Sequence, residues 1–136
     1  MIDLGCGSGL LSLAAHSLGI HDILATDNNA SAIESTKATF KENNISGEVV
    51  AGNCANNIHQ KFDVLLCNPP FHKGFDTNNT LTKQFVCAAK RLLKPSGKAY
   101  FVTNSFIGIE KFAEHYFDRI ETLENDTHFK VLRFSK

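Results

Sequence analysis

The sequence lacks the features that define several protein classes. No hydrophobic run approaches the roughly 20 residues that span a bilayer, so we predict no transmembrane segment. The net charge is zero, with 14 Lys and Arg against 14 Asp and Glu, and 43% of the residues are hydrophobic, which excludes disorder as the main state. The first residues carry no basic stretch, so we expect no signal peptide. The 136 residues are therefore predicted to form one globular domain, residues 1–136.

Cysteine and histidine spacings typical of disulfide frameworks or metal sites are also missing. None of the four cysteines forms a CxxC pair. Cys6 lies in a glycine-rich turn and Cys67 lies inside an apolar run. The six histidines are scattered along the chain. We therefore predict no disulfides and no metal, and we expect a reducing, cytoplasmic location.

The zero net charge hides an asymmetry between the two halves of the chain. Residues 1–68 carry three cations and seven anions, whereas residues 69–136 carry eleven cations and seven anions. If the second half forms one side of the fold, that side is suited to an anionic partner. The alternative is an ordinary solvated helix face.

Strand-like and helix-like segments alternate along the chain. Periodicity and turn residues predict strands at 1–4, 22–26, 48–51, 62–67, 98–103, 120–123 and 129–134, and helices at 10–18, 30–43, 80–93 and 109–116. The first helix is apolar nearly all round, which is typical of a helix packed in an interior. The alternation predicts an α/β fold with a mostly parallel sheet covered on both faces, closed by an antiparallel pair. Because the first strand is short for a central position, we expect the domain to be incomplete at its N-terminus.

A glycine-rich turn, D-L-G-C-G-S-G, follows the first strand and opens the first helix. In a parallel sheet this position is at the carboxyl edge, where ligands bind. The spacing is G-x-G-x-G with Leu10 next, so it fits the dinucleotide fingerprint poorly. Asp3 would repel a pyrophosphate but suits a cationic or amino-bearing ligand. A merely tight strand-to-helix turn is the alternative.

Two further polar positions follow the next two strands. Asp27 ends the second strand, where a carboxylate can accept hydrogen bonds from a ribose diol. Its alternative role is to stabilise the N-terminus of the following helix. Asn53 follows the third strand and could bind an adenine edge, or it could be a turn residue. Asn28, next to Asp27, is included in this predicted cofactor site.

The fourth strand ends in Asn68, Pro69, Pro70 and Phe71. Two prolines stiffen the backbone and remove two N–H donors. The Asn68 side-chain oxygen and the Pro69 carbonyl remain as acceptors, which suit a ligand that presents an NH2 group. Phe71 offers a face on which a planar base can stack. A rigid turn with Phe71 in the core is the alternative.

The combination of these motifs resembles S-adenosylmethionine-dependent methyltransferases that modify exocyclic amines. Residues 68–74, 102–106 and 129–133 look more specifically like the catalytic domain of the ribosomal RNA small subunit methyltransferase C family, and the large-subunit methyltransferase G is similar. The resemblance implies a three-layer Rossmann-like methyltransferase fold, with a mostly parallel seven-stranded sheet and an antiparallel last strand. Members usually carry a second, N-terminal domain, so we expect one to be missing from this chain.

The resemblance also implies the roles of the predicted site residues. The glycine turn and Asp3 would bind the methionine end of S-adenosylmethionine, Asp27 the ribose, and Asn53 would lie near the adenine. The implied cofactor residues are Asp3, Gly5, Cys6, Gly7, Gly9, Asp27, Asn28, Asn53 and Asn68. The implied catalytic residues, which receive the target base, are Asn68, Pro69, Pro70 and Phe71.

The predicted function is methyl transfer to the exocyclic N2 of a guanine in ribosomal RNA, with the small subunit favoured. Candidate contacts to RNA phosphates are Lys73, Lys83, Lys90, Arg91, Lys94, Lys130 and Arg133. Alternatives are methylation of adenine in nucleic acid or of a protein glutamine, and a truncated module that binds cofactor without turnover. A nicotinamide-dependent oxidoreductase does not fit the glycine spacing and has no use for the Asn-Pro-Pro corner.

Overall fold

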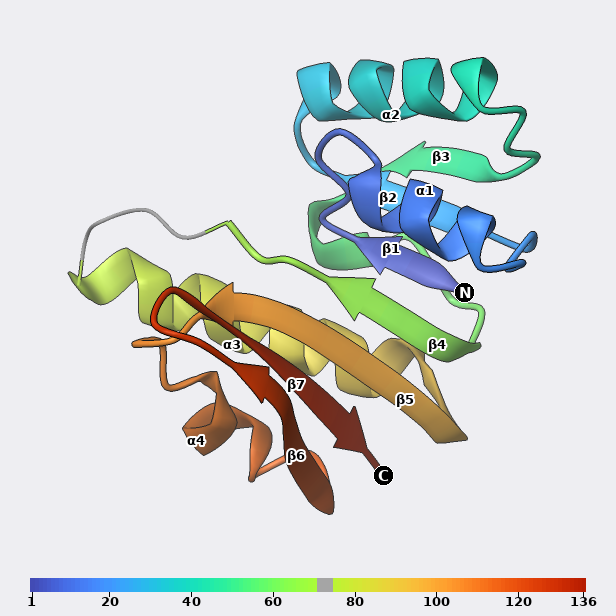
Figure 1. Ribbon diagram of the computed structural model, residues 1–136. Coiled ribbons are helices and arrows are strands. Elements are labelled where there is room, and N and C mark those ends of the chain that lie inside the picture. The colour runs from blue at the N-terminus through green and yellow to red at the C-terminus, as the bar shows by residue number, and fades with distance from the viewer. Residues whose placement is uncertain (71–74) are drawn as a thin grey trace.

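A computed structural model describes residues 1–70 and 75–136, apart from the side chains of 75–79, and contains a seven-stranded sheet (Figure 1). The strand order is β3-β2-β1-β4-β5-β7-β6. The strands are β1 Ile2–Leu4, β2 Leu24–Asp27, β3 Glu48–Ala51, β4 Phe62–Cys67, β5 Leu93–Asn104, β6 Arg119–Asn125 and β7 Phe129–Ser135. The helices are α1 Leu10–Ser17, α2 Ala30–Glu42, the short 3₁₀ turn η1 Asn53–Ala55, α3 Phe75–Leu92 and α4 Ile109–Ala113.

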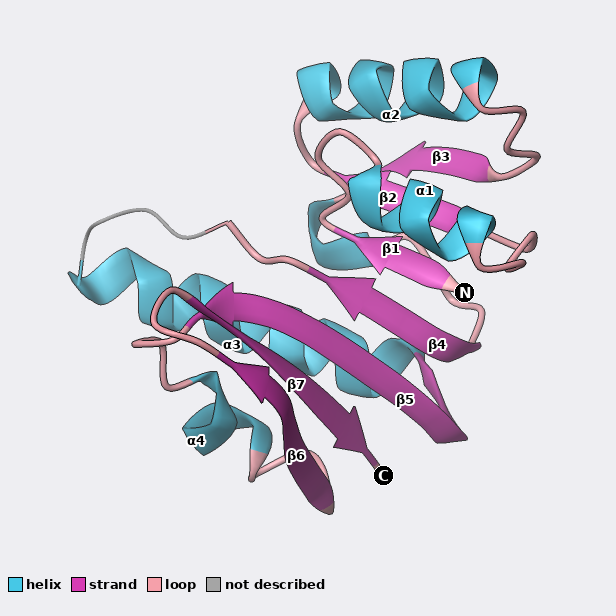
Figure 2. Ribbon diagram, viewed as in Figure 1, coloured by secondary structure: helices cyan, strands magenta, loops and turns pink. Residues whose placement is uncertain are grey.

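Strand directions confirm the predicted sheet (Figure 2). The strands β1 to β5 pair in parallel, whereas β7 is antiparallel to both β5 and β6. Helices α1 and α2 lie on one face, while α3 and α4 lie on the other (Figure 1). The predicted three-layer α/β arrangement is therefore confirmed.

Alternation along the strands divides the core into two clusters, one on each face of the sheet. On the α3 face, Leu24, Leu65, Phe101 and Phe134 pack with buried residues of α3 and α4. On the α2 face, the next residue of β2, Ala25, belongs to a smaller cluster that includes Phe40 of α2. This is the period-2 pattern of strands that are buried on both faces.

The sheet is covered less evenly than the sequence predicts. On the face opposite α3, strands β4, β5 and β7 expose part of their side chains. The half-buried residues there include Val64, Leu66, Tyr100, Val102 and Val131. Among the described strands, burial on both faces is limited to β1 and β2, whereas the edge strand β3 has no buried residue.

Some element boundaries and one packing prediction differ from the structure. Helix α3 begins at Phe75, five residues earlier than predicted, and β5 begins directly after it at Leu93. The predicted interior packing of α1 is wrong, because Leu10 is 69% exposed and Leu18 is 84% exposed. The apolar pattern predicts the helix correctly, but it does not reveal that Leu10 and the C-cap residue Leu18 face solvent.

Neither a spanning helix nor a metal site is found in the part of the chain that the structure describes. No helix there combines the length and apolar character needed to cross a membrane. No group of three His, Cys, Asp or Glu side chains there is placed to hold a metal ion.

Candidate active site

A cavity of about 210 Å³ lies at the carboxyl edge of the sheet, where the strand order reverses between β1 and β4. This topological switch point is where open α/β sheets bind ligands. The wall combines polar groups after three strands with two apolar side chains of α3. It is formed by Leu4, Gly5, Thr26, Asp27, Asn28, Gly52, Asn53, Cys54, Pro70, Leu81 and Phe85.

The glycine turn is fastened to β2 by backbone hydrogen bonds. The N–H groups of Gly5 and Cys6 both donate to the Thr26 carbonyl, at 2.9 and 3.0 Å. Gly5 has a φ of +76°, and a Cβ there would lie 3.1 Å from the Phe85 ring. Any side chain at this position would be strained and would crowd the cavity wall. Gly5 is therefore required both for the turn and for the close approach of α3.

Asp27 joins the glycine turn to the start of α2. One carboxylate oxygen accepts from the Gly7 N–H at 3.0 Å, and the other accepts from the Asn29 N–H at 2.9 Å. Asn29 in turn caps α2, since its side chain accepts from the Ser31 N–H at 2.8 Å. Each Asp27 oxygen keeps further acceptor capacity toward the cavity that it lines. The helix-terminal role and the ligand role are thus compatible.

Asp3 is buried behind the glycine turn. Its Oδ2 accepts from the backbone N–H of Ser12 at 3.0 Å and from the Ser12 hydroxyl at 2.6 Å. Since Gly9 at the N-cap of α1 has no side chain, Asp3 supplies the capping acceptor from β1. Burial raises the pKa of the Asp3 carboxyl, the Ser12 hydrogen bonds oppose this, and the Asp27 charge adds to it. Its second oxygen, Oδ1, is buried with no hydrogen-bond partner among the described residues.

The wall beyond β3 is held by an arginine of α3. In the turn η1, Cys54 and Ala55 adopt positive φ values of 44° and 54°, which non-glycine residues rarely do. The Arg91 guanidinium donates to the carbonyls of Cys54, Ala55 and Ile58, at 3.1, 2.8 and 2.7 Å. These contacts hold the turn that places Asn53 on the cavity wall.

The Asn-Pro-Pro corner continues directly from β4. Leu4 of β1 is in register with Cys67 of β4, so Asn68 follows at the level of the glycine turn. The Asn68 side chain is exposed, Pro69 is buried, and Pro70 lines the cavity. The predicted stacking residue, Phe71, lies outside the described residues. Of the described residues of the corner, Pro70 therefore forms part of the cavity wall, and Asn68 and Pro69 directly precede it in the chain.

Cys6 is placed away from the cavity. Its sulfur accepts from the Thr36 hydroxyl at 3.2 Å, and its side chain packs in the smaller core cluster. Burial raises the pKa of this thiol to about 11, so the thiol stays protonated at neutral pH. Cys6 thus contributes to the turn through its backbone and to the core through its side chain.

The structure brings together part of the predicted site. Five predicted residues line the cavity: Gly5, Asp27, Asn28, Asn53 and Pro70. Six others are not among the wall residues: Asp3, Cys6, Gly7, Gly9, Asn68 and Pro69. The sequence interpretation missed six wall residues, Leu4, Thr26, Gly52, Cys54, Leu81 and Phe85. Thr26 and Gly52 are each one residue from a predicted position. Leu81 and Phe85 are i and i+4 on α3, so finding them requires knowing which face of that helix turns toward the cavity.

Comparison with known protein families agrees with this arrangement. The methyltransferase small domain family matches residues 1–133. The chain belongs to this family. Its curated relatives include "Ribosomal RNA small subunit methyltransferase C" from Haemophilus influenzae, 36% identical over 132 residues, and from Pseudoalteromonas translucida, 37% identical over 135 residues. Each alignment covers 96% of this chain but only 40% and 39% of the relative, so the chain spans about 40% of the length of these proteins.

Solved structures show the same methyltransferase fold. A 16S rRNA N2 methyltransferase (RsmC) from Thermus thermophilus, solved in complex with AdoMet and guanosine, superimposes with a TM-score of 0.88 at 26% identity, covering 99% of this chain and 36% of that chain. A ribosomal protein L11 methylase from Lactobacillus delbrueckii subsp. bulgaricus superimposes with a TM-score of 0.83 at 20% identity, covering 99% and 68%. The second likeness shows the fold alone. The Rossmann-like methyltransferase fold expected from the sequence is confirmed.

The residues of this methyltransferase small domain fit the cofactor expected from the sequence. Two buried oxygens at the carboxyl edge, Asp3 Oδ1 and Thr26 Oγ1, have no hydrogen-bond partner among the described residues. Buried polar atoms without partners are rare and are typical of places where a ligand or water completes the set. Gly5 leaves room on the wall, and Asp27 and Asn53 add polar groups to it.

Proposed function

We propose that this domain is the catalytic part of an S-adenosylmethionine-dependent ribosomal RNA methyltransferase that modifies the exocyclic N2 of guanine. The observation that carries the proposal is the position of the stiff, donor-poor Asn68–Pro69–Pro70 corner beside a polar cavity at the switch point of a methyltransferase sheet. The names of its relatives support an rRNA substrate and, for the structure from Thermus thermophilus, the N2 atom. The relatives are much longer, which supports a second domain in the whole protein.

The cofactor is proposed to lie along the carboxyl ends of β1, β2 and β3. S-adenosylmethionine supplies a methyl group on a positively charged sulfur. Asp27 offers carboxylate oxygens to the ribose hydroxyls, and Asn53 offers an amide to the adenine. The buried carboxyl of Asp3 is proposed to favour the ammonium group at the methionine end.

The Asn-Pro-Pro corner is proposed to hold the target amine. The lone pair of an exocyclic amine is delocalised into its ring, so the nitrogen is a weak nucleophile. The Asn68 Oδ1 and the Pro69 carbonyl can each accept one amine hydrogen, which orients the lone pair. The same acceptors stabilise the positive charge that develops on the nitrogen during transfer. Orientation of this kind contributes roughly 7–11 kcal/mol in well-aligned systems.

Chemistry at the corner does not by itself choose among amine substrates. The same acceptors would serve adenine N6 or a glutamine side chain. The relative solved with guanosine, at 26% identity, favours guanine over both. A domain that binds cofactor without turnover is disfavoured by the retention of the complete Asn-Pro-Pro corner, which such a module does not need.

The proposal is tested by the identity of the methylated product. The protein, in its whole natural length, is incubated with small ribosomal subunits and isotopically labelled S-adenosylmethionine. Digestion of the rRNA and mass spectrometry are expected to find the label in N2-methylguanosine. Label in N6-methyladenosine or in ribosomal protein would replace the substrate assignment, and the absence of transfer to any acceptor would remove the enzyme assignment.

Asp27→Ala is expected to weaken cofactor binding roughly tenfold, because the ribose loses a charge-assisted hydrogen-bond acceptor. Isothermal titration calorimetry with S-adenosylmethionine measures the change. Glu34→Ala is the matched control, because it removes an exposed carboxylate that pairs with Lys37 on α2. It is expected to leave the affinity unchanged. Equal affinities of Asp27→Ala and the parent would show that the ribose assignment is wrong.

A further inference from the structure

The structure reduces the set of basic residues that can bind RNA phosphates. Lys94 pairs with Asp63 at 2.8 Å, and Lys130 is buried and pairs with Glu110 at 2.6 Å. Arg91 is engaged by three backbone carbonyls, as described above. Of the seven sequence candidates, Lys73 lies outside the described residues.

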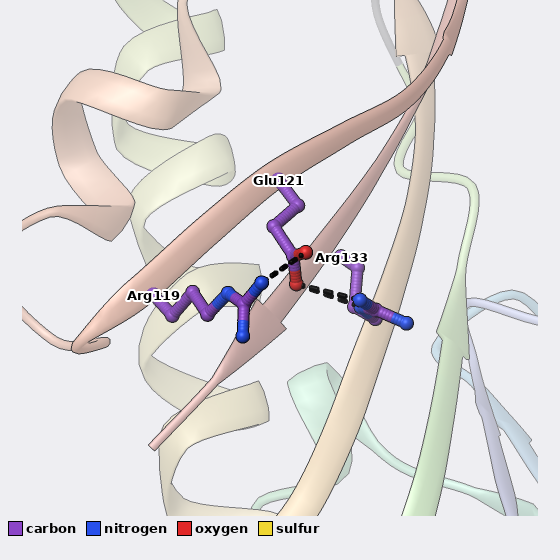
Figure 3. A network of polar contacts seen from close by, with 3 residues as sticks. All are labelled: Arg119, Glu121 and Arg133. Atoms are coloured by element: carbon purple, nitrogen blue, oxygen red, sulfur yellow. Dashed lines mark hydrogen bonds and ion pairs between the residues drawn. The ribbon is translucent and has the colours of Figure 1, made fainter.

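Arg133 is also committed to an internal contact. Figure 3 shows Glu121 between Arg119 and Arg133, with its two oxygens divided between them. The Arg133 Nη2 lies 2.8 Å from Glu121 Oε2, and the Arg119 Nη2 lies 2.9 Å from Oε1. Only Lys83 and Lys90 of α3 therefore remain as candidates with neither a carboxylate nor a backbone carbonyl partner among the described residues.

Lys83 opens onto a concave surface that the sequence interpretation did not include. A groove of about 340 Å³ lies between α3 and α4, and we call it the α3–α4 groove. It is lined by Lys83, Lys111, Phe112, His115 and Tyr116. The Lys83 Nζ lies 5.0 Å from the centroid of the Phe112 ring, which holds the ammonium group over the aromatic face.

The charge of this groove is positive and largely uncompensated. Neither Lys83 nor Lys111 has an ion-pair partner among the described residues, and none of the lining residues is acidic. Glu110 on the same helix pairs with Lys130, and the exposed Glu114 and Asp118, which lie before and after His115 and Tyr116 in the chain, do not line the groove. Two lysines, a histidine and two aromatic rings are the combination that favours nucleic acid.

The groove lies close to the candidate active site. Leu81 and Phe85 of α3 line the cavity, whereas Lys83 lies between them in sequence and lines the α3–α4 groove. Residues two apart on a helix point in nearly opposite directions, so α3 separates the two sites by about one helix diameter, roughly 10–12 Å. Helix α4 follows the carboxyl end of β5, and Figure 1 shows it beside the N-terminal half of α3.

We propose that the α3–α4 groove binds the phosphate backbone of single-stranded RNA next to the target nucleotide, with Lys83 and Lys111 as the phosphate contacts. This inference rests on the proposed function for the choice of RNA as the partner. A guanine that is turned out of its stack needs its flanking backbone held, since the base alone gives little binding energy. The groove binds this flanking backbone without recognising the sequence, because its cations contact phosphates rather than base edges.

The test compares two double variants with the same loss of charge. Lys83→Gln with Lys111→Gln removes the groove cations, and Lys41→Gln with Lys98→Gln removes two exposed lysines that lie elsewhere. Binding of a fluorescein-labelled, guanosine-containing single-stranded RNA is measured over a series of salt concentrations. The slope of log association constant against log salt concentration is negative. In the groove variant its magnitude is expected to be smaller by about 1.4, since each phosphate contact to a single strand contributes about 0.7. Its affinity at low salt is expected to fall several-fold, and the control pair is expected to retain most of the parent slope.

Two further readouts separate this inference from the proposed function. Cofactor affinity is expected to stay unchanged in the groove variant, and its kcat on ribosomal subunits is expected to stay near the parent value while KM rises. A salt slope equal to that of the control pair would overturn the groove assignment even if guanine is methylated. Failure of the parent to methylate guanine would overturn the proposed function, while the salt slopes would still report on the groove.

Discussion

Asn68→Ala is expected to lower kcat for methyl transfer by roughly two to three orders of magnitude, the range seen when one acceptor or donor that stabilises transition-state charge is removed. The alanine leaves the Pro69 carbonyl alone to orient the amine, so the lone pair is no longer fixed. Cofactor affinity is expected to change little, because Asp27, Asn53 and Gly5 line the cavity independently of Asn68. Single-turnover transfer from labelled S-adenosylmethionine to ribosomal subunits, with calorimetry of cofactor binding, measures both quantities.

Two controls make the Asn68 result specific. Asn68→Asp keeps both an acceptor oxygen and the side-chain shape, so it is expected to retain more activity than Asn68→Ala. Asn56→Ala changes another exposed asparagine, at the end of the η1 turn, and is expected to keep parent turnover. Unchanged turnover of Asn68→Ala would show that the Asn-Pro-Pro corner does not hold the reacting amine.

The fold was predictable because its signals are local. The strands β3 and β4 have the predicted boundaries, since each apolar run ends in turn residues. The start of α3 was missed because the segment before Thr80 is polar and contains two adjacent asparagines, which have low helix propensity. The exposure of Leu10 and Leu18 was missed for a different reason: periodicity predicts a helix but does not say which of its apolar side chains find partners.

The candidate site was predictable where one residue acts alone at the end of a strand. Asp27 ends β2 and Asn53 lies two residues after β3, and the sheet edge brings them to the same cavity. The contacts of Arg91 could not be read from the sequence, because its partners are backbone carbonyls more than 30 residues away. The commitment of Lys130 and Arg133 to ion pairs likewise depends on the register between distant segments. Charge counting therefore could not separate the cations with internal partners from those without.

Asp3→Asn separates two roles that the structure gives to one carboxylate. Asparagine keeps an oxygen that can accept from the Ser12 N–H and hydroxyl, so the cap of α1 is expected to remain. The charge is lost, so affinity for S-adenosylmethionine is expected to fall roughly 10- to 100-fold, as for the loss of a charge-assisted contact. Calorimetry measures the affinity, and thermal unfolding with and without cofactor measures its effect on Tm.

The stability of the ligand-free protein is expected to change in the opposite direction. Burial raises the pKa of Asp3 above its ordinary value of 3.8 in the folded protein. The stability that this carboxyl contributes is therefore fully present below the unfolded-state pKa and is lost as pH rises through the raised folded pKa. Asparagine does not titrate, so ligand-free Asp3→Asn is expected to show less stability loss as pH rises and, above the raised pKa, to melt at or above the parent Tm.

A positively charged ligand would offset the charge of the buried Asp3 carboxylate and so remove its destabilising effect. The Tm of the parent is therefore expected to rise more on cofactor addition than the Tm of Asp3→Asn. Asp3→Ala, which removes the cap as well as the charge, is expected to lose both stability and affinity and so reports the structural role alone when compared with Asp3→Asn. If Asp3→Asn binds S-adenosylmethionine as tightly as the parent, Asp3 is only the cap of α1, and its unpartnered Oδ1 does not serve the cofactor.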